Sequence, residues 1–455
     1  MRCLSMKLVP CLALLLFCAC VAVAEIANPA ETLPVLGARQ VQLVESPEIT
    51  LLDQEGAGKL YQAGPIQVLV MEGTPAEMGF QHGRLLAKKI HHLIREGYMP
   101  KALWGRGYSQ EYVKTQSERM EKHFPPEIIE EMRGIVEGVK KAGVEDIAYE
   151  DIRLGVTQAE ILHFPPDSPP SCSNFAVWGR WTTDGRLLHA RNLDWNIKGD
   201  AQDDALVLVW RPKGGFPFMM IGWAGGVGSV SGMNARGITL GEMTLPSADA
   251  TFDGLPLFLQ MRLMLEKCDT LAKSVEFFEK CKRTTGWNFI IGDGGKRDGR
   301  ALETDAKYCT EFTTMDPKET DATGHWGMAE CVRRTNHPVG MDQLLRLSKA
   351  YGDKIGVTVE TPEQLTLMAP LLKEQDSWQR YEWLSRAVEA QPGKIDAVGA
   401  VKILATGPVY CDATLHSFVF DPSAQTAWVA IAGNNPPVTA TDMPFTKLVL
   451  TEWFK

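Results

Sequence analysis

The sequence predicts an α+β fold in which two packed antiparallel sheets are covered by helices. Two observations lead to this prediction. Up to Pro170 the apolar residues recur mostly with helical periodicity, whereas after it short β runs alternate with turn sequences and with separate helical segments. Strands joined as hairpins must bury one face of their sheet, and two sheets packed face to face with helices outside achieve this.

Residues 1–24 have the pattern of an export signal. A basic start precedes an apolar centre, Leu8 to Cys20, and a small-residue cleavage sequence that ends at Ala24. The apolar run is short for a membrane span of about 20 residues. A lipoprotein signal is an alternative because Cys18 and Cys20 lie near the cleavage sequence. We therefore expect a secreted or periplasmic protein with no transmembrane segment.

The composition is that of an ordinary globular protein with an acidic balance. The 455 residues are 45% hydrophobic and 23% charged, and the net charge is −9. A negative balance disfavours nucleic acid and anionic membrane surfaces as main partners.

Cysteine usage leaves the redox state open. Of the ten cysteines, six follow residue 24, and they could form three disulfides or leave Cys172 as a free thiol. Their spacing assigns no pairing. No pair has the CxxC spacing of a zinc ribbon, and the glycine-rich string Gly-Trp-Ala-Gly-Gly lacks the context of a dinucleotide site. We expect no metal and no cofactor.

The first part of the chain, residues 25–171, is expected to be mostly helical. Residues 25–63 look like an irregular lead-in, and a strand begins at Ile66. Helices are predicted from Thr74, which is followed by a proline at the first helical position, and over 125–142.

The second part, residues 172–455, is expected to hold the two sheets. Its β runs are separated by turns such as Thr-Asp-Gly and Asn-Ala-Arg-Gly. Helices are predicted between the runs, at about 255–281, 341–352, 361–373 and 395–404.

Cys172 stands where a stiff linker, Ser-Pro-Pro-Ser, meets a strand that begins Phe-Ala-Val-Trp. If the bond before it is cut, this one residue carries both a thiol and a free α-amine. The pKa of such an amine is about 8 and that of a thiol about 8.5, so the amine can take the thiol proton near neutral pH. A buried free thiol or half of a disulfide is the alternative role for Cys172.

Arg191 and Asp194 follow in the string His-Ala-Arg-Asn-Leu-Asp-Trp-Asn. A hairpin turn at Thr-Asp-Gly-Arg lets this strand return beside the one that Cys172 begins. A guanidinium near the sulfur favours the thiolate, and a carboxylate near the amine orients it. An ion pair exposed at a strand end is the simpler interpretation of these two residues.

These strings together resemble the autoproteolytic acyltransferase/hydrolase family of N-terminal-nucleophile hydrolases, which includes the fungal penicillin acyltransferase. Choloylglycine hydrolases and acid ceramidase resemble it more distantly. The likeness rests on Cys172-Ser-Asn-Phe-Ala-Val, on Asp184-Gly-Arg and on Arg191-Asn-Leu-Asp194-Trp195. It extends along most of the chain, through residues 73–83, 232–243, 287–293, 334–338 and 414–422.

The resemblance implies a four-layer αββα fold and a precursor that cuts its own Ser171–Cys172 bond. The products would be a small chain, 25–171, and a catalytic chain, 172–455, which stay associated. Cys172 would be the nucleophile of an amidase or acyltransferase acting on an N-acyl amide or another acyl donor. Asp194 would steady its α-amine, and Arg191 would lie near the thiol. Asn336 would donate to the oxyanion.

Two positions depart from the family pattern. Ser171 precedes the nucleophile where glycine is common, and Thr244 aligns near a second oxyanion asparagine of the choloylglycine relatives. Asn234, at the head of a turn, is a further candidate for the oxyanion, and Trp195 for the acyl pocket.

Two other functions remain open. The first is a secreted binding protein that keeps the fold without catalysis. The second is a papain-like protease, which fits less well because its cysteine begins a helix rather than a strand.

Overall fold

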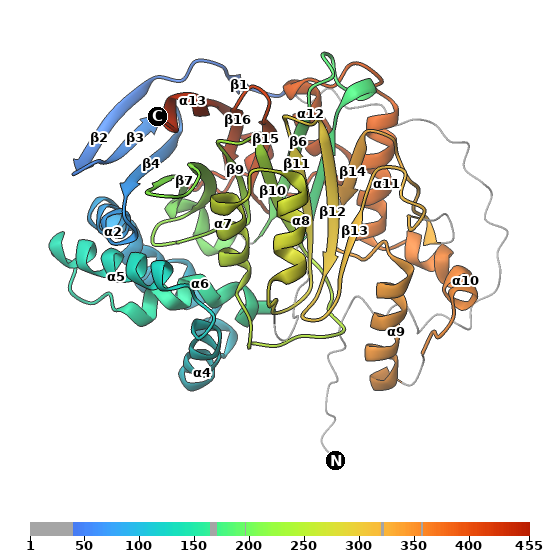
Figure 1. Cartoon of the computed structure of the whole chain (residues 1–455), viewed down its shortest axis with the longest axis horizontal. Helices are drawn as coiled ribbons and strands as arrows, with labels where there is room; N and C mark the ends of the chain where they lie inside the picture. Colours follow the sequence, from blue (N-terminus) through green and yellow to red (C-terminus); the bar gives the residue numbers. More distant parts are fainter. Residues whose placement is uncertain (1–39, 164–170, 196, 320–322, 356–357) are drawn as a thin grey trace.

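The computed structural model describes residues 40–163, 171–195, 197–319, 323–355 and 358–455. The predicted export signal, residues 1–24, lies outside the described residues. So does most of the linker before Cys172. Within the described residues, two sheets pack face to face and helices lie on both outer sides, which is the αββα sandwich that the resemblance implies (Figure 1).

The larger sheet has ten strands. Their order is β13-β12-β11-β10-β9-β8-β7-β4-β3-β2. In chain order these strands are β2 (Ile49–Glu55), β3 (Gly58–Ala63), β4 (Ile66–Gly73), β7 (Ala205–Pro212), β8 (Phe218–Trp223), β9 (Ser231–Asn234), β10 (Ile238–Thr244), β11 (Trp287–Asp293), β12 (Asp298–Thr304) and β13 (Cys309–Phe312).

The smaller sheet has seven strands and carries Cys172. Their order is β1-β17-β16-β15-β6-β5-β14. In chain order they are β1 (Leu43–Val44), β5 (Ser171–Val177), β6 (Leu188–Asp194), β14 (Cys331–Arg334), β15 (Thr414–Asp421), β16 (Thr426–Ile431) and β17 (Phe445–Val449). β5 and β6 face β10 and β11 of the larger sheet.

Helices that precede Cys172 in the chain and helices that follow it cover different strands of the sheets (Figure 1). α11 and α12 lie on the smaller sheet, α7 and α8 on the larger one, and α2 packs on α5 beside β4. The helices are α2 (Pro75–His91), α3 (Tyr98–Ala102), α4 (Gln110–Glu121), α5 (Pro126–Lys141), α6 (Tyr149–His163), α7 (Leu257–Lys267), α8 (Leu271–Lys280), α9 (Met341–Ile355), α10 (Pro362–Lys373), α11 (Asp376–Glu389), α12 (Ala397–Leu404) and α13 (Leu450–Trp453).

The sequence of β7 shows how the layers are held. Val207 and Val209 point between the two sheets, where they meet apolar residues of β15 and β16, whereas Leu208 and Trp210 belong to the core under the helices. Side chains of a strand alternate between its two faces, and both faces of β7 are covered. The strand is therefore apolar on both sides, with valines between the sheets.

The N-terminal part of the chain contributes strands to both sheets. β4 pairs in parallel with β7, from Val68 opposite Val207 onward, and β1 pairs in parallel with β17. All other strand pairs of the two sheets are antiparallel. The sheets are thus antiparallel except where residues before the linker join residues after it.

Residues 49–63 differ from the irregular lead-in expected from the sequence, because β2 and β3 form a hairpin there. β2 is an edge strand that is almost entirely exposed, so its sequence shows no alternation of apolar and polar residues. Its turn contains Gly56 in the left-handed region, with φ 57°. A glycine turn between two weak strands was the signal for this hairpin.

Two helical segments also differ from the predictions. The segment 255–281 is two helices, because Thr270 caps the start of α8 through a hydrogen bond from the Lys273 N–H. α11 was not predicted at all, although it supplies residues to the site described below.

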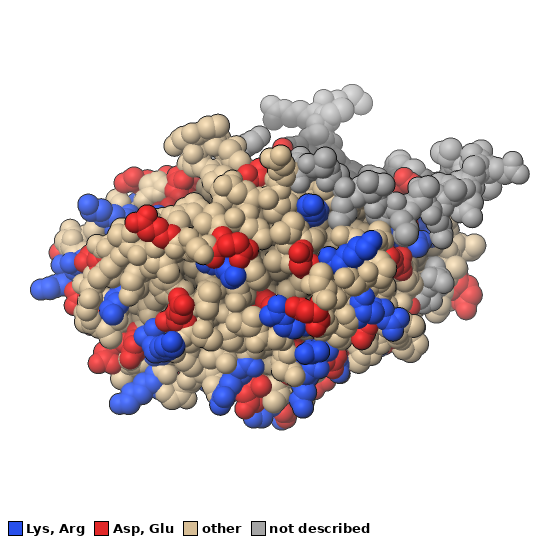
Figure 2. All heavy atoms as spheres, turned by 90° about the horizontal axis from the view of Figure 1, so that it is seen from above, with Lys and Arg blue, Asp and Glu red and all other residues tan. Residues whose placement is uncertain are grey.

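The face in Figure 2 shows acidic and basic side chains interspersed over the surface. None of the helices in the described ranges combines the length and the apolar composition that a bilayer span requires.

Candidate active site

Strands β5 and β6 run side by side and set the framework of the site. Their antiparallel register places Ser171 opposite Asp194, Cys172 opposite Leu193 and Asn174 opposite Arg191. Directly opposed residues point to the same face of a sheet. Cys172 and Arg191 therefore share one face, and Asp194 emerges on the other face, beside the Ser171–Cys172 bond.

Cys172 is buried, with 1% of its surface exposed. Burial raises the pKa of its thiol to about 12, while the Arg191 guanidinium acts in the opposite direction. Its backbone N–H donates to Asn336 Oδ1 at 2.6 Å. In the uncut chain the thiol is thus protonated at neutral pH, and its peptide nitrogen is held by a residue far away in the sequence.

Arg191 is fully buried and connects the sulfur to a carboxylate. Its Nη2 lies 3.7 Å from Cys172 Sγ and 3.2 Å from Glu242 Oε2. Its Nη1 donates to Ser231 Oγ at 2.6 Å, and this hydroxyl lies 3.0 Å from His416 Nε2. The guanidinium is therefore fixed on one side by Glu242 and on the other by Ser231.

Gly241 on β10 makes room for this arrangement. A Cβ at this position would lie 2.5 Å from Asn174 Nδ2 and 3.1 Å from Arg191 Cδ. Because no side chain is present, Arg191 can cross β10 and reach Glu242. This close approach between the two sheets explains the glycine in the Leu-Gly-Glu-Met string.

Asp194 is buried on the opposite face of β6. Thr414 Oγ1 donates to its Oδ1 at 2.6 Å, and its Oδ2 has no hydrogen-bond partner among the described residues. Burial raises the pKa of this carboxyl to about 7, and the Thr414 hydrogen bond partly offsets the shift. One carboxylate oxygen thus remains open beside the bond that precedes Cys172.

Asn336 lies between the Cys172 backbone and the end of β10. Its Oδ1 accepts the Cys172 N–H and also Arg380 Nη2, at 3.1 Å. Its Nδ2 donates to the Thr244 carbonyl at 2.9 Å, which uses one of the two amide hydrogens. Arg380 Nη1 also donates to the Cys172 carbonyl. Arg380, which lies on α11, thus binds the backbone of Cys172 as well.

The other candidates from the sequence take different positions. Thr244 contributes its backbone carbonyl to Asn336, and its hydroxyl lies 3.5 Å from Glu242 Oε1. Trp195 donates its indole N–H to Tyr98 on α3, at 2.8 Å.

Asn234 is not brought to Cys172. Its Nδ2 donates to the Leu265 and Cys268 carbonyls, and its Oδ1 accepts the N–H groups of Arg236 and Ile238. Asn234 therefore closes the turn between β9 and β10 and ties it to the end of α7. All of its polar groups are engaged there, which leaves none for an oxyanion.

Glu242 and Arg380 are site residues that the sequence analysis did not find. Glu242 is the charged residue of an otherwise uncharged strand, and burial raises its pKa to about 7. A charged residue within a buried strand was the available signal. Arg380 pairs with Asp376 one helical turn earlier, so its signal was that of an ordinary surface helix.

The arrangement has the parts that acyl transfer needs. A thiol lies next to a fixed positive charge, amide and guanidinium donors surround the adjacent backbone, and a carboxylate oxygen is open nearby. Cys172 and the other five described cysteines are free thiols. In the described ranges, no three histidine, cysteine or carboxylate side chains gather as they would around a metal ion.

Comparison with known proteins supports the resemblance seen in the sequence. Residues 181–339 match the family described as "Acyl-coenzyme A:6-aminopenicillanic acid acyl-transferase". This range begins after Cys172 and includes Arg191, Glu242 and Asn336.

Two relatives match more of the chain. An uncharacterized protein of Archaeoglobus fulgidus is 27% identical over 350 residues, which are 72% of this chain and 55% of that protein. The chain thus spans about half the length of this relative. Protein dcd1B of Dictyostelium discoideum is 24% identical over 406 residues, which are 85% of this chain and 73% of that protein.

Among solved structures, an N-acylethanolamine-hydrolyzing acid amidase ortholog of Caenorhabditis elegans is 14% identical, with a TM-score of 0.39, and covers 55% of this chain and 93% of that one. A mutant conjugated bile acid hydrolase from Clostridium perfringens is 12% identical, with a TM-score of 0.39, and covers 62% and 93%. Penicillin V acylase from Agrobacterium tumefaciens is 16% identical, with a TM-score of 0.36, and covers 57% and 83%. These TM-scores are too low to carry an inference about this chain.

Proposed function

Since residues 181–339 match the acyl-coenzyme A:6-aminopenicillanic acid acyl-transferase family, we propose that the protein is an exported amidohydrolase or acyltransferase with Cys172 as its N-terminal nucleophile. The family match supports the coarser level, an acyl-transferring or amide-hydrolysing enzyme. The nucleophile, the cleavage and the export are our proposals. The contact that carries them is the 2.6 Å hydrogen bond from the Cys172 N–H to Asn336, in a site where Arg191 lies beside the sulfur.

Activation begins with the Ser171–Cys172 bond. The Cys172 sulfur adds to the Ser171 carbonyl, and the peptide nitrogen leaves as the α-amine of Cys172 with the former thiol proton. Water then hydrolyses the thioester, which gives a Ser171 carboxylate and a free thiol. The groups in place support this step, because Asn336 already binds the nitrogen that must leave.

In turnover the new α-amine accepts the thiol proton as the sulfur attacks the carbonyl of an N-acyl amide. The proton then passes to the leaving nitrogen, and the acyl group remains on Cys172 as a thioester. Water completes hydrolysis, whereas an amine acceptor completes transfer. A thiol pKa near 12 before cleavage supports the need for this base, because the buried thiol does not ionise by itself.

The surrounding residues have separate roles in this proposal. Arg191 provides positive charge at the sulfur, and Asp194 binds the α-ammonium through its open Oδ2. The second amide hydrogen of Asn336 and the guanidinium of Arg380 stabilise the oxyanion. Loss of one oxyanion donor typically lowers kcat by about 10²-fold to 10³-fold.

The partner of the catalytic chain is its own N-terminal part. In the proposal residues 25–171 remain bound after cleavage, because β4 pairs with β7 inside the larger sheet. The export signal 1–24 directs the precursor out of the cytoplasm. The substrate class is a linear amide that carries an acyl group.

The first test is cleavage itself. Purified full-length protein is analysed by intact mass and N-terminal sequencing, and we expect a new N-terminus at Cys172. The Cys172→Ala variant should remain uncut. Cys331→Ala is the matched control, because Cys331 is an equally buried free thiol on the neighbouring strand β14.

Turnover is measured on fluorogenic coumarin amides with acyl groups of increasing length. The parent and Cys331→Ala should release the coumarin, and Cys172→Ala should not. An uncut chain that hydrolyses these amides would overturn the mechanism. The parent could instead remain uncut and inactive. If it then binds the amides with the same affinity as Cys172→Ala, the protein is a binding protein.

A further inference from the structure

We infer that His325 and His337 form a positioning pair that fixes Asn336 at Cys172 through the hydroxyl of Ser377. This inference rests on the proposed function, because it assigns these residues to the same site. Neither histidine touches Cys172. Their effect is exerted through the backbone of Asn336.

The two imidazoles share one hydrogen bond. His325 Nε2 lies 2.8 Å from His337 Nε2, and both side chains are buried. The outer nitrogen of each ring also has a partner: His325 Nδ1 lies 2.8 Å from Thr323 Oγ1, and His337 Nδ1 lies 2.7 Å from Ser377 Oγ. The pair is thus one continuous chain of hydrogen bonds from Thr323 to Ser377.

The positions of the protons along this chain of hydrogen bonds depend on one another. Between two Nε2 atoms only one can carry the hydrogen, so one ring is the donor and the other the acceptor. If His325 donates, the single hydrogen of His337 lies on Nδ1 and points to Ser377. If His337 donates, its Nδ1 accepts from the Ser377 hydroxyl or from that of Thr335, which lies 3.1 Å away. Either arrangement satisfies every nitrogen, provided that both rings are neutral or share a single extra proton.

Ser377 transmits this arrangement to the site. Its Oγ accepts the backbone N–H of Asn336 at 2.8 Å and lies 3.0 Å from Thr335 Oγ1. The Asn336 side chain in turn binds the Cys172 N–H and the Thr244 carbonyl. A shift of the Ser377 hydroxyl therefore moves the residue that holds the nucleophile.

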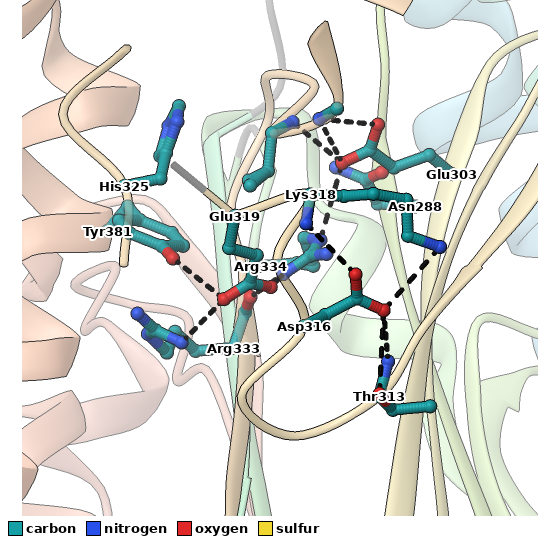
Figure 3. A network of polar contacts seen from close by, with 12 residues as sticks. Asn288, Glu303, Thr313, Asp316, Lys318, Glu319, His325, Arg333, Arg334 and Tyr381 are labelled. Carbon is teal, nitrogen blue, oxygen red and sulfur yellow. Dashed lines mark hydrogen bonds and ion pairs between the residues drawn. The ribbon is translucent and has the colours of Figure 1, made fainter. Parts of the chain in front are cut away.

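Aromatic rings keep the pair in place. Trp378 on α11 stacks on His337, with ring centroids 3.6 Å apart and an interplanar angle of 14°. Tyr381 meets His325 edge to face, at 4.8 Å and 89°. His325 lies beside Tyr381 in Figure 3. These contacts leave the rings little freedom to turn.

A charged network surrounds the pair. Arg333 and Arg334 of β14 bind Glu319, and Arg334 also lies 3.5 Å from Glu303 of β12 (Figure 3). Burial and then the nearby cations keep the pKa of both histidines well below the usual value. These cations are Arg334, Arg333 and Lys373 of α10 for His325, and Arg380 of α11 and Arg334 for His337, whose pKa the neighbouring His325 also lowers. Both rings are therefore neutral at neutral pH, which is one of the two protonation states that the hydrogen-bond chain allows.

The test compares two substitutions of His325 on the coumarin amides. His325→Gln keeps an amide group that can donate to His337 Nε2, so its kcat should stay close to that of the parent. His325→Leu leaves this nitrogen without a partner, and kcat should fall about 10-fold to 10²-fold with KM little changed. Circular dichroism melting of both variants shows whether they are folded.

Ser377→Ala provides the second arm. It removes the link to Asn336, so its kcat should fall as in His325→Leu, and the double variant should lose no more than either single one. Additive losses would overturn the inference, and so would equal losses in His325→Gln and His325→Leu.

NMR of isotope-labelled histidines separates this inference from the proposed function. The parent should show one ring protonated on Nε2 and directed to the other ring, and Ser377→Ala should change the tautomer balance of the pair. Unchanged ring signals would overturn the inference even if the amides are not hydrolysed. An inactive, uncut parent whose ring signals do respond would overturn only the proposed function.

Discussion

The Arg191–Glu242 pair is the most heavily desolvated charged contact beside Cys172. The side chains are 0% and 3% exposed, and their closest atoms are 3.2 Å apart. A buried pair of opposite charges adds little net stability to the fold, because the cost of removing both ions from water offsets their attraction. Removal of one partner, however, leaves the other charge buried alone.

We therefore expect Glu242→Gln to destabilise the fold by about 1–3 kcal/mol, because Arg191 stays buried without a counter-charge, whereas burial already opposes ionisation of Glu242. Urea denaturation measures this change. Glu276→Gln, which breaks an exposed pair with Lys280, is the matched control and should leave the stability nearly unchanged. A loss of less than about 1 kcal/mol in Glu242→Gln would show that Arg191 finds another partner.

At this scale the sequence predicted four residues that the structure brings together: Cys172, Arg191, Asp194 and Asn336. Cys172, Arg191 and Asp194 lie in local strings with a chemical meaning, whereas Asn336 was implied by the resemblance to the family. Arg380 could not be found in this way. Its role depends on where α11 packs, and this contact spans 208 residues of sequence.

Helices α2 and α5 pack more closely than side chains normally allow. Gly79 and Gly83 of α2 face Gly134 and Gly138 of α5, and each backbone fills the space of the missing side chain on the other. A Cβ on Gly83 would lie 1.9 Å from the Ile135 carbonyl oxygen. The contact leaves no room for even one methyl group.

Gly83→Ala should therefore force the two helices apart and destabilise the protein by about 1–3 kcal/mol. Gly155→Ala in α6 is the matched control, because nothing lies within 4 Å of the Cβ it would add. This variant should be neutral or more stable by up to about 1 kcal/mol, since alanine favours helices. Thermal denaturation of both variants decides. Equal melting temperatures would mean that the α2–α5 contact adapts.

Elements were predictable from the sequence where one pattern covered the whole segment. The helix from Thr74 and the one over 125–142 have prolines at their starts and long apolar stripes, and both are present. The hairpin of β2 and β3 was not predicted, because its outer strand is exposed on both faces and so shows no apolar alternation. α11 was not predicted although Tyr381, Leu384 and Val388 recur at helical spacing, because polar and charged residues separate them.

In the whole molecule, the two expected chains meet at a buried carboxyl group. Glu160 of α6 accepts the Leu257 N–H at the start of α7 and the Thr284 hydroxyl, through the same oxygen. Its other oxygen has no partner among the described residues. Burial raises the pKa of this carboxyl to about 7, so it keeps its proton in the folded state over a range where the unfolded chain has lost it.

The sign of the resulting pH dependence follows from linkage. Between about pH 4.5 and 7 the folded state binds more protons at Glu160 than the unfolded state does, so this group lowers the stability as the pH rises. Glu160→Gln removes the titrating carboxyl group and keeps the shape of the side chain. Relative to the parent, the variant should gain up to about 3 kcal/mol between pH 4.5 and 8. Urea denaturation at both pH values measures the gain, and a constant difference would contradict the expected pKa.

The layered architecture followed from strand and turn patterns, whereas the way the chain enters the sheets did not. The apolar runs predicted two covered sheets, and both are present. The parallel pairing of β4 with β7 joins segments that are 139 residues apart at Val68 and Val207. Local sequence patterns carry no information about which distant strand a segment will meet.

Because of that pairing, a cleaved molecule would refold under different conditions from those in which the uncut chain folds. The uncut chain can assemble in one unimolecular event, since β4 and β7 are tethered to each other. If the backbone is cut before Cys172, as we propose, denaturation would release two separate polypeptides, and refolding would require them to associate again in dilute solution. The active form would then be a product that the cell can make once per translated copy and cannot repair.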